Sequence, residues 1–223
     1  MSLADGLHLI RDHIESEVGE TLEVVARAVT LEVELPDEVR IESLGAFPAR
    51  SLHGRTLIDL GDLVSGQEVD VPLRLSFSFG EIGATMPAVF SLVDRDGVLD
   101  GAADRTAWEF ADDRANDRQP RDREVDRTVA GIFAARARRR AVELNRQGDY
   151  DAASHALKAT ARKIRAYAGK DAELRQIVDG LMAESEMFGQ VMFERTRKEH
   201  FAMSSHALQS RDMEGRARRT QHG

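Results

Sequence analysis

The chain has 223 residues, enough to bury one sizeable core or two small ones. It has no cysteine, which excludes disulfides, a thiolate nucleophile and cysteine-ligated metal sites and favours a reducing compartment, so we expect a cytoplasmic protein. The net charge of −8 is unevenly divided, since residues 1–120 hold 10 Lys/Arg against 24 Asp/Glu (−14) and residues 121–223 hold 21 against 15 (+6). Opposite charges favour docking of the two halves on each other, and leave the basic half as the place for an acidic partner. No stretch approaches ~18 consecutive apolar residues, so no membrane span is expected.

Residues 1–27 are predicted to form an amphipathic helix, because apolar residues recur along it at spacings of three and four. An apolar helix face of this length is expected to be buried against another surface in a soluble protein. We expect it to pack on the β-rich part of its own chain or, more simply, against the same helix of a second copy in a homodimer. The candidate interaction residues of this helix are Leu7, Ile10, Ile14 and Val18.

Residues 28–111 are predicted to form an antiparallel β-sandwich, because short apolar stretches alternate with turn signals at intervals of roughly ten residues. In the first predicted strand, Val29–Leu35, apolar residues alternate with polar ones, and Pro36-Asp37 ends the strand. The last predicted strand, Thr106–Phe110, is expected to bury Trp108. Between these two, the predicted strands are Val39–Leu44, Leu57–Leu60, Val69–Phe79 and Ala88–Val93.

Residues 112–123 are predicted to be a linker, because they are highly charged, have no apolar residue larger than alanine and include Pro120. Residues 124–210 are predicted to form an antiparallel helical bundle of three helices. The breaks fall at Gly148-Asp149 and Gly169–Asp171, where a glycine ends one helix and an aspartate caps the next. Residues 211–223 are predicted to be a basic tail. The fold class is therefore α+β and multidomain: an N-terminal helix, a β-sandwich and a helical bundle.

No catalytic, cofactor-binding or metal-binding residue is predicted. The seven histidines are scattered, without the spacing that a zinc hydrolase uses. Asp94–Gly97 opens like a calcium loop but lacks the glutamate that such a loop needs after its glycine, so a hairpin turn is favoured. Phosphate-binding glycine motifs and a Gly-x-Ser-x-Gly elbow are also missing. We therefore expect a non-enzymatic chain that uses no cofactor.

Basic side chains group on two of the predicted helices and form a candidate site for phosphate groups. No aromatic residue is interleaved for stacking on bases. A solvated or domain-docking face is favoured, and a nucleic-acid-binding or regulatory protein is the alternative. The residues concerned are Arg136, Arg138, Arg139, Arg140, Arg162, Lys163 and Arg165.

Several short stretches resemble one known family. Glu32–Ile41 and Ile58–Leu63, with Ala141–Leu144 leading to Gly148-Asp149-Tyr150, are similar to the region C-terminal to the von Willebrand factor type A domain in bacterial proteins of the calcium-activated-chloride-channel-like group. The metal motif of that domain, Asp-x-Ser-x-Ser, does not carry over, because Arg74–Ser78 has arginine in place of the aspartate.

The resemblance implies that the N-terminal helix is the last helix of a truncated type A domain. It also implies that this chain is a structural, protein-interaction module of a larger scaffold protein, whose partner the sequence does not identify.

Overall fold

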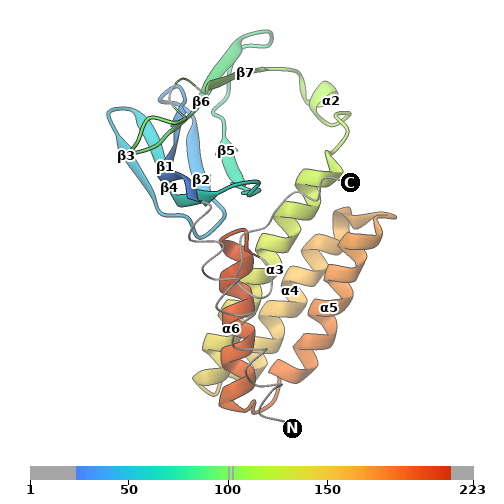
Figure 1. The fold of residues 1–223 in the computed structure, drawn as a ribbon. Coiled ribbons are helices and arrows are strands. Elements are labelled where there is room, and N and C mark those ends of the chain that lie inside the picture. Colours follow the sequence, from blue (N-terminus) through green and yellow to red (C-terminus); the bar gives the residue numbers. More distant parts are fainter. Residues whose placement is uncertain (1–23, 100, 102, 212–223) are drawn as a thin grey trace.

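The computed structural model describes residues 24–99, 101 and 103–211, which contain seven strands and five helices (Figure 1). Strands come first in the chain and helices follow, so the prediction of a mixed α+β chain is confirmed. The predicted N-terminal helix, with Leu7, Ile10, Ile14 and Val18, lies outside the described residues apart from its last turn. There the prediction is wrong, because residues 24–27 belong to strand β1. The predicted basic tail also lies outside the described residues, except Arg211.

The main sheet has five antiparallel strands in the order β3-β4-β1-β6-β7. Its centre is the long strand β1 (Val24–Glu34), which pairs with β4 (Arg55–Val64) on one side and β6 (Thr85–Val93) on the other. Alternation in β1 places Val29 and Val33 in the core, beside Ile58 of β4. The outer strands are β3 (Ala49–Leu52) and β7 (Ala103–Glu109).

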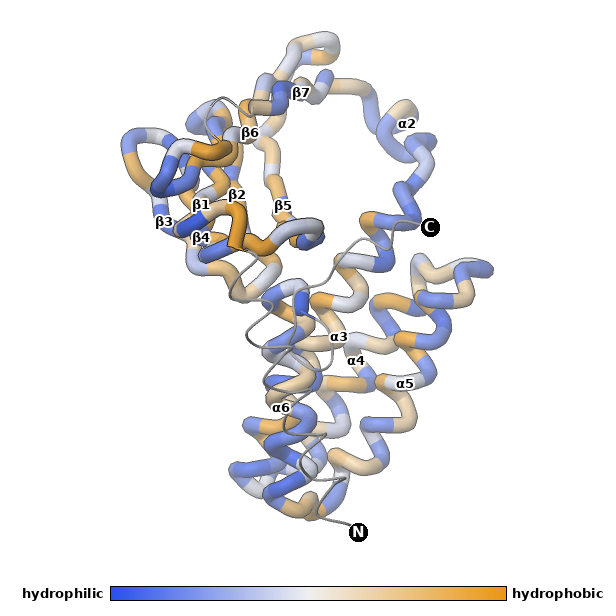
Figure 2. Tube along the Cα trace, in the orientation of Figure 1, coloured by the Kyte–Doolittle hydropathy of each residue, from blue (hydrophilic) through white to orange (hydrophobic). Residues whose placement is uncertain are grey.

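A second sheet has two strands, β2 (Arg40–Ser43) and β5 (Leu73–Ser76). Apolar residues follow β5 and β6 in the view of Figure 2. That the two sheets form a sandwich stays a prediction. The expectation that the last strand buries Trp108 is wrong, since 36% of this residue is exposed. The alternation of a strand identifies its apolar face but does not tell whether another layer covers that face.

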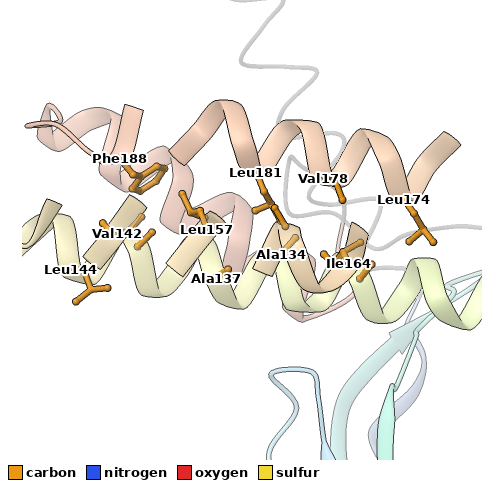
Figure 3. Packing of buried hydrophobic residues seen from close by; sticks show 14 of the residues in the cluster. Ala134, Ala137, Val142, Leu144, Leu157, Ile164, Leu174, Val178, Leu181 and Phe188 are labelled. Atoms are coloured by element: carbon orange, nitrogen blue, oxygen red, sulfur yellow. The ribbon is translucent and has the colours of Figure 1, made fainter. Parts of the chain in front are cut away.

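The helical part consists of α3 (Arg123–Arg146), α4 (Tyr150–Ala168), α5 (Ala172–Phe188) and α6 (Glu194–Leu208). The predicted aspartate caps are present: Asp149 accepts the N–H of Ala152 at 3.1 Å, and Asp171 accepts that of Leu174 at 3.0 Å. Helix α6 is a fourth helix beyond the three predicted. Small and aliphatic side chains of α3, α4 and α5 point toward one another in the core (Figure 3). No helix in the described part of the chain is long and apolar enough to cross a membrane.

A buried contact region joins the helical part to the β-rich part. Leu44 packs with Ile132 and Ala135 of α3 and with Leu208 at the end of α6. The N–H of Ala46 donates to the carbonyl of Leu208 at 2.9 Å. Residues 112–123 join the two parts by a separate path that includes a single helical turn, α2 (Asp113–Asn116), which the linker prediction did not contain.

Candidate functional site

The candidate site is a cleft of about 700 Å³ where β7 and the segment after β5 approach α2. We call it the aromatic cleft, because aromatic side chains supply most of its apolar lining. Polar and charged side chains from the end of β7, from α2 and from the segment after α2 complete the lining. The principal residues are Phe77, Phe79, Met86, Trp108, Phe110, Glu109, Asp113, Asn116 and Gln119.

The apolar alternation of β5 positions two of the aromatic residues. In the sequence this alternation continues beyond the end of the strand, where Phe77 and Phe79 follow Leu73 and Leu75 at every second position. Phe77 lies against Trp108 of β7, with ring centroids 5.3 Å apart and planes tilted by 58°. Tilted aromatic pairs at this separation are mutually attractive, so the two rings hold each other in place.

A glycine allows the neighbouring wall of the cleft to form. The Phe110 ring lies so close to Gly80 that a Cβ atom built there would be 2.5 Å from a ring carbon. Phe110 is itself fixed by its backbone, since its N–H donates to the carbonyl of Ala84 at 2.9 Å and its carbonyl accepts the N–H of Gly83 at 2.8 Å. Any larger residue at position 80 would push the ring away, so this close approach requires glycine.

The cleft exposes an unusual amount of apolar surface. Phe79 is fully exposed at 108%, Ile82 in the adjoining turn is 74% exposed, and Phe77 and Trp108 are 39% and 36% exposed. Single exposed apolar residues are common on proteins, and Phe193 of this chain, 86% exposed outside the cleft, is one of them. Adjacent exposed aromatics in a concave surface are instead typical of a binding site.

Strand β7 borders the cleft and is exposed along its whole length. All seven of its residues are exposed, and in the described part of the chain it pairs with β6 alone. The charged residues that line the cleft, Glu109 and Asp113, are both acidic. The surface therefore combines apolar rings, an open strand edge and negative charge.

The basic residues predicted from the sequence lie elsewhere, and two of those on α3 hold the fold together. Arg136 donates to the carbonyl of Ser43 at 3.1 Å and so joins α3 to β2. The Nε atom of Arg138 donates to Glu184 of α5 at 2.7 Å. Both side chains thus form hydrogen bonds within the chain.

The next two arginines of α3 share one carboxylate. Arg139 and Arg140 approach Glu143 at 4.0 and 3.5 Å, and the guanidinium of Arg139 lies 5.3 Å from the centroid of the Phe201 ring. These partners neutralise part of the positive charge that a phosphate would need. The remaining basic candidates are exposed on α4: Arg162, Lys163 and Arg165.

The loop that resembles a calcium site is closed by its own backbone. The carboxylate of Asp94 accepts the N–H of Leu99 at 2.7 Å and that of Asp96 at 3.1 Å. The hydrogen bond from Leu99 is the main reason that the pKa of Asp94 lies below its usual value. Among the described residues, no three His, Asp or Glu side chains are grouped so that they could hold a metal ion.

The aromatic cleft was not predicted from the sequence, because Trp108 was expected to be buried and Phe77 was placed within a predicted strand of the β-sandwich. One local signal was present. Phe79-Gly80 and Ile82-Gly83 place large apolar residues inside a glycine-rich turn, and turns of this kind lie on the surface.

Comparison with known proteins gives little further information. No family model matches the chain, and no curated protein matches its sequence. Among solved structures, the chain is similar to a von Willebrand factor type A protein from Catenulispora acidiphila, with a TM-score of 0.47 and 13% identity over 86% of this chain. The chain spans 42% of the length of that protein.

Proposed function

We propose that this chain is a non-enzymatic protein-interaction module and that the aromatic cleft, together with strand β7, is its binding surface. The observation that carries the proposal is the full exposure of Phe79 near the tilted ring pair of Phe77 and Trp108. Burial of one such side chain against a partner is worth about 1.5–3 kcal/mol. Aromatic residues of this kind are also enriched among the residues that contribute most to protein–protein binding.

The chemistry of the lining favours a protein partner over other ligands. Glu109 and Asp113 repel the phosphates of a nucleic acid, and most of the α3 arginines are paired within the chain. The lining has no histidine or lysine, the groups that most often act as general base or activated amine in catalysis. Apolar rings with an acidic border match a surface that presents apolar side chains next to lysine or arginine.

The wider role that we propose follows from the sequence resemblance. The stretches that are similar to the region after a type A domain are structural here: Glu32–Ile41 runs from β1 into β2, and Ile58–Leu63 lies in β4. We propose that the chain supports a larger scaffold protein of that group, and that the aromatic cleft is where the scaffold binds a protein.

Site-specific photo-crosslinking tests the proposal. A photoreactive phenylalanine analogue placed at Phe79 is expected to give a discrete protein adduct in cells that express the chain. The same analogue at Phe193 is the matched control, because that phenylalanine is also largely exposed but lies outside the cleft. Absence of any adduct from position 79, or the same adducts from both positions, would show that the aromatic cleft is not a protein-binding surface.

A further inference from the structure

Within the part of the chain that the structure describes, strand β7 has one edge that pairs with no other strand. The N–H of Phe110 donates to Ala84 of the β6 side. In an antiparallel strand, the N–H and C=O groups of successive residues point alternately to the strand on one side and to the strand on the other. The backbone groups of Trp108, Thr106 and Asp104 therefore also point toward β6. The N–H and C=O groups of Ala103, Arg105, Ala107 and Glu109 therefore point to the free edge.

Two further observations agree with this assignment. Pro87 of β6 lies opposite Ala107, and proline has no N–H to offer to that pair. The N–H of Arg105 does not bond to β6 but donates to the side chain of Asp104 at 2.8 Å. A strand of seven exposed residues with such an edge is a template for another strand.

The residues on this edge are self-complementary in one register. If Ala107 lies opposite Ala107 of a second copy, Arg105 lies opposite Glu109 of that copy, and Glu109 opposite its Arg105, so two ion pairs form by symmetry. Antiparallel pairing centred on Arg105 or on Glu109 would instead place like charges opposite each other. Among the described residues, neither the Arg105 guanidinium nor the Glu109 carboxylate has an ion-pair partner within its own chain.

We propose that β7 pairs antiparallel with β7 of a second copy, with Ala107 at the twofold axis, so that two five-stranded sheets join into one. This inference rests on the proposed function, because it names the occupant of the same surface. It also places a second strand beside one of the exposed aromatics, Trp108. In this register Trp108 lies opposite Thr106 of the second copy, and the two Trp108 side chains are diagonal neighbours, within about 7–8 Å.

The pairing replaces one contact of the single chain. The bond from the Arg105 N–H to the Asp104 carboxylate gives way to a bond to the Glu109 carbonyl of the second copy. Because each chain exchanges one bond for another at this position and gains bonds at Ala107 and Glu109, the exchange favours the dimer. The dimer is expected to weaken as salt is added, since its ion pairs lie at the surface.

Exchange of the charges at positions 105 and 109 tests the proposed register of the β7–β7 pair, with dimerisation measured by sedimentation. The wild-type chain is expected to form a concentration-dependent dimer. Arg105→Glu and Glu109→Arg each convert two attractive pairs into two repulsive ones and are expected to raise the dimer dissociation constant about ten-fold or more. The combined variant restores opposite charges and is expected to return to within about three-fold of the wild type. Arg165→Glu on α4, with the same change of charge away from the edge, is expected to have no effect.

A second measurement does not depend on charge. The chain has no cysteine, so Ala107→Cys introduces a single thiol, and a directly opposed hydrogen-bonded pair has Cα atoms about 5.5 Å apart, which a disulfide can bridge. Oxidation is expected to link Ala107→Cys chains into covalent dimers. Ala103→Cys, also exposed on β7, is expected to form no covalent dimer on oxidation, because the two copies of position 103 lie far apart in this register.

Several outcomes would overturn the proposal: a monomeric wild type at all concentrations, a dimer indifferent to both single charge changes, or a failure of the combined variant to recover. A dimer lost only on Ile10→Glu/Ile14→Glu would overturn it too, and would assign the interface to the predicted N-terminal helix. If photo-crosslinking at Phe79 gives an adduct with a different protein while the chain sediments as a monomer, the β7 dimer is refuted and the protein-binding function stands. If position 79 gives no adduct at all, the proposed function itself fails.

Discussion

Substitution of Asn145 tests how α6 is attached to the rest of the bundle. Asn145 lies near the end of α3 and is 1% exposed. Its side-chain amide donates to the carbonyl of Phe188 at 2.9 Å and to that of Gln190 at 2.7 Å, where the chain leaves α5. Arg197 of α6 donates to its side-chain oxygen at 3.5 Å. One side chain thus connects α3 with the end of α5 and with α6.

Asn145→Ala removes the donor for both carbonyls. A buried polar group left without a partner costs about 1–3 kcal/mol, so the buried Phe188 carbonyl alone predicts a loss of about 1–3 kcal/mol in the free energy of unfolding, to which the part-buried bond to Gln190 adds a smaller amount. That is a large part of the ~5–15 kcal/mol that stabilises a typical domain. The carbonyl that loses the shorter bond is that of Gln190, in the segment leading to α6, so hydrogen exchange is expected to rise first in α6.

The assay is urea denaturation followed by far-UV circular dichroism. Asn116→Ala is the matched control, because Asn116 is exposed and makes a single bond of 3.3 Å to the carbonyl of Ala111. Its expected cost is within about 0.5 kcal/mol. A loss below about 1 kcal/mol for Asn145→Ala, or equal losses for the two variants, would contradict the dependence of the buried Phe188 carbonyl on this side chain.

Two further predictions concern the helical part. Phe188 is fully buried and Phe193 is 86% exposed, so Phe188→Ala is expected to cost about 3–5 kcal/mol and Phe193→Ala almost nothing; similar losses in chemical denaturation would contradict the placement of the core. The hydrogen bonds from Arg127 and then from the Leu174 N–H lower the pKa of Asp171 in the folded state. The stability from this carboxylate is therefore present above its unfolded pKa of about 3.9 and lost as the pH falls through its lower folded pKa. The melting temperature of the wild type should fall more steeply below about pH 4 than that of Asp171→Asn, and parallel curves would contradict the assignment.

The strands that bury apolar residues were predictable from the sequence, whereas a strand held only by its backbone was not. Val29 and Val33 alternate with polar residues because one face of β1 is covered, and that pattern identified the strand. Strand β3 carries no such pattern, since all four of its residues are exposed. It is a strand only because Ala49–Leu52 pairs with β4, a long-range contact that local periodicity does not encode.

Among the helices, too, those with local sequence signals were predicted and the one without them was not. The aspartate caps at Asp149 and Asp171 are local signals, and they placed two helix starts correctly. Helix α6 was missed because its buried positions are Ser204 and Leu208, so half of its buried set is polar. The Ser204 hydroxyl donates to the carbonyl of His200 one turn earlier at 2.7 Å, which lets a polar residue occupy a core position.

The candidate site arises because β7 is an outer strand of the sheet. Its place in the strand order could not be read from the sequence. Among the described residues, no strand pairs with the outer edge of β7, and the Trp108 ring is 36% exposed. A small apolar ligand in the aromatic cleft would cover the rings but leave the backbone groups of Arg105, Ala107 and Glu109 unpaired. A globular surface without a free strand would do the same. Only an added strand satisfies the edge and brings side chains over the rings at once, because successive side chains of a strand alternate between the two faces of the sheet. This joint requirement is why we assign the surface to a β-strand and, through the charges of Arg105 and Glu109, to β7 of a second copy.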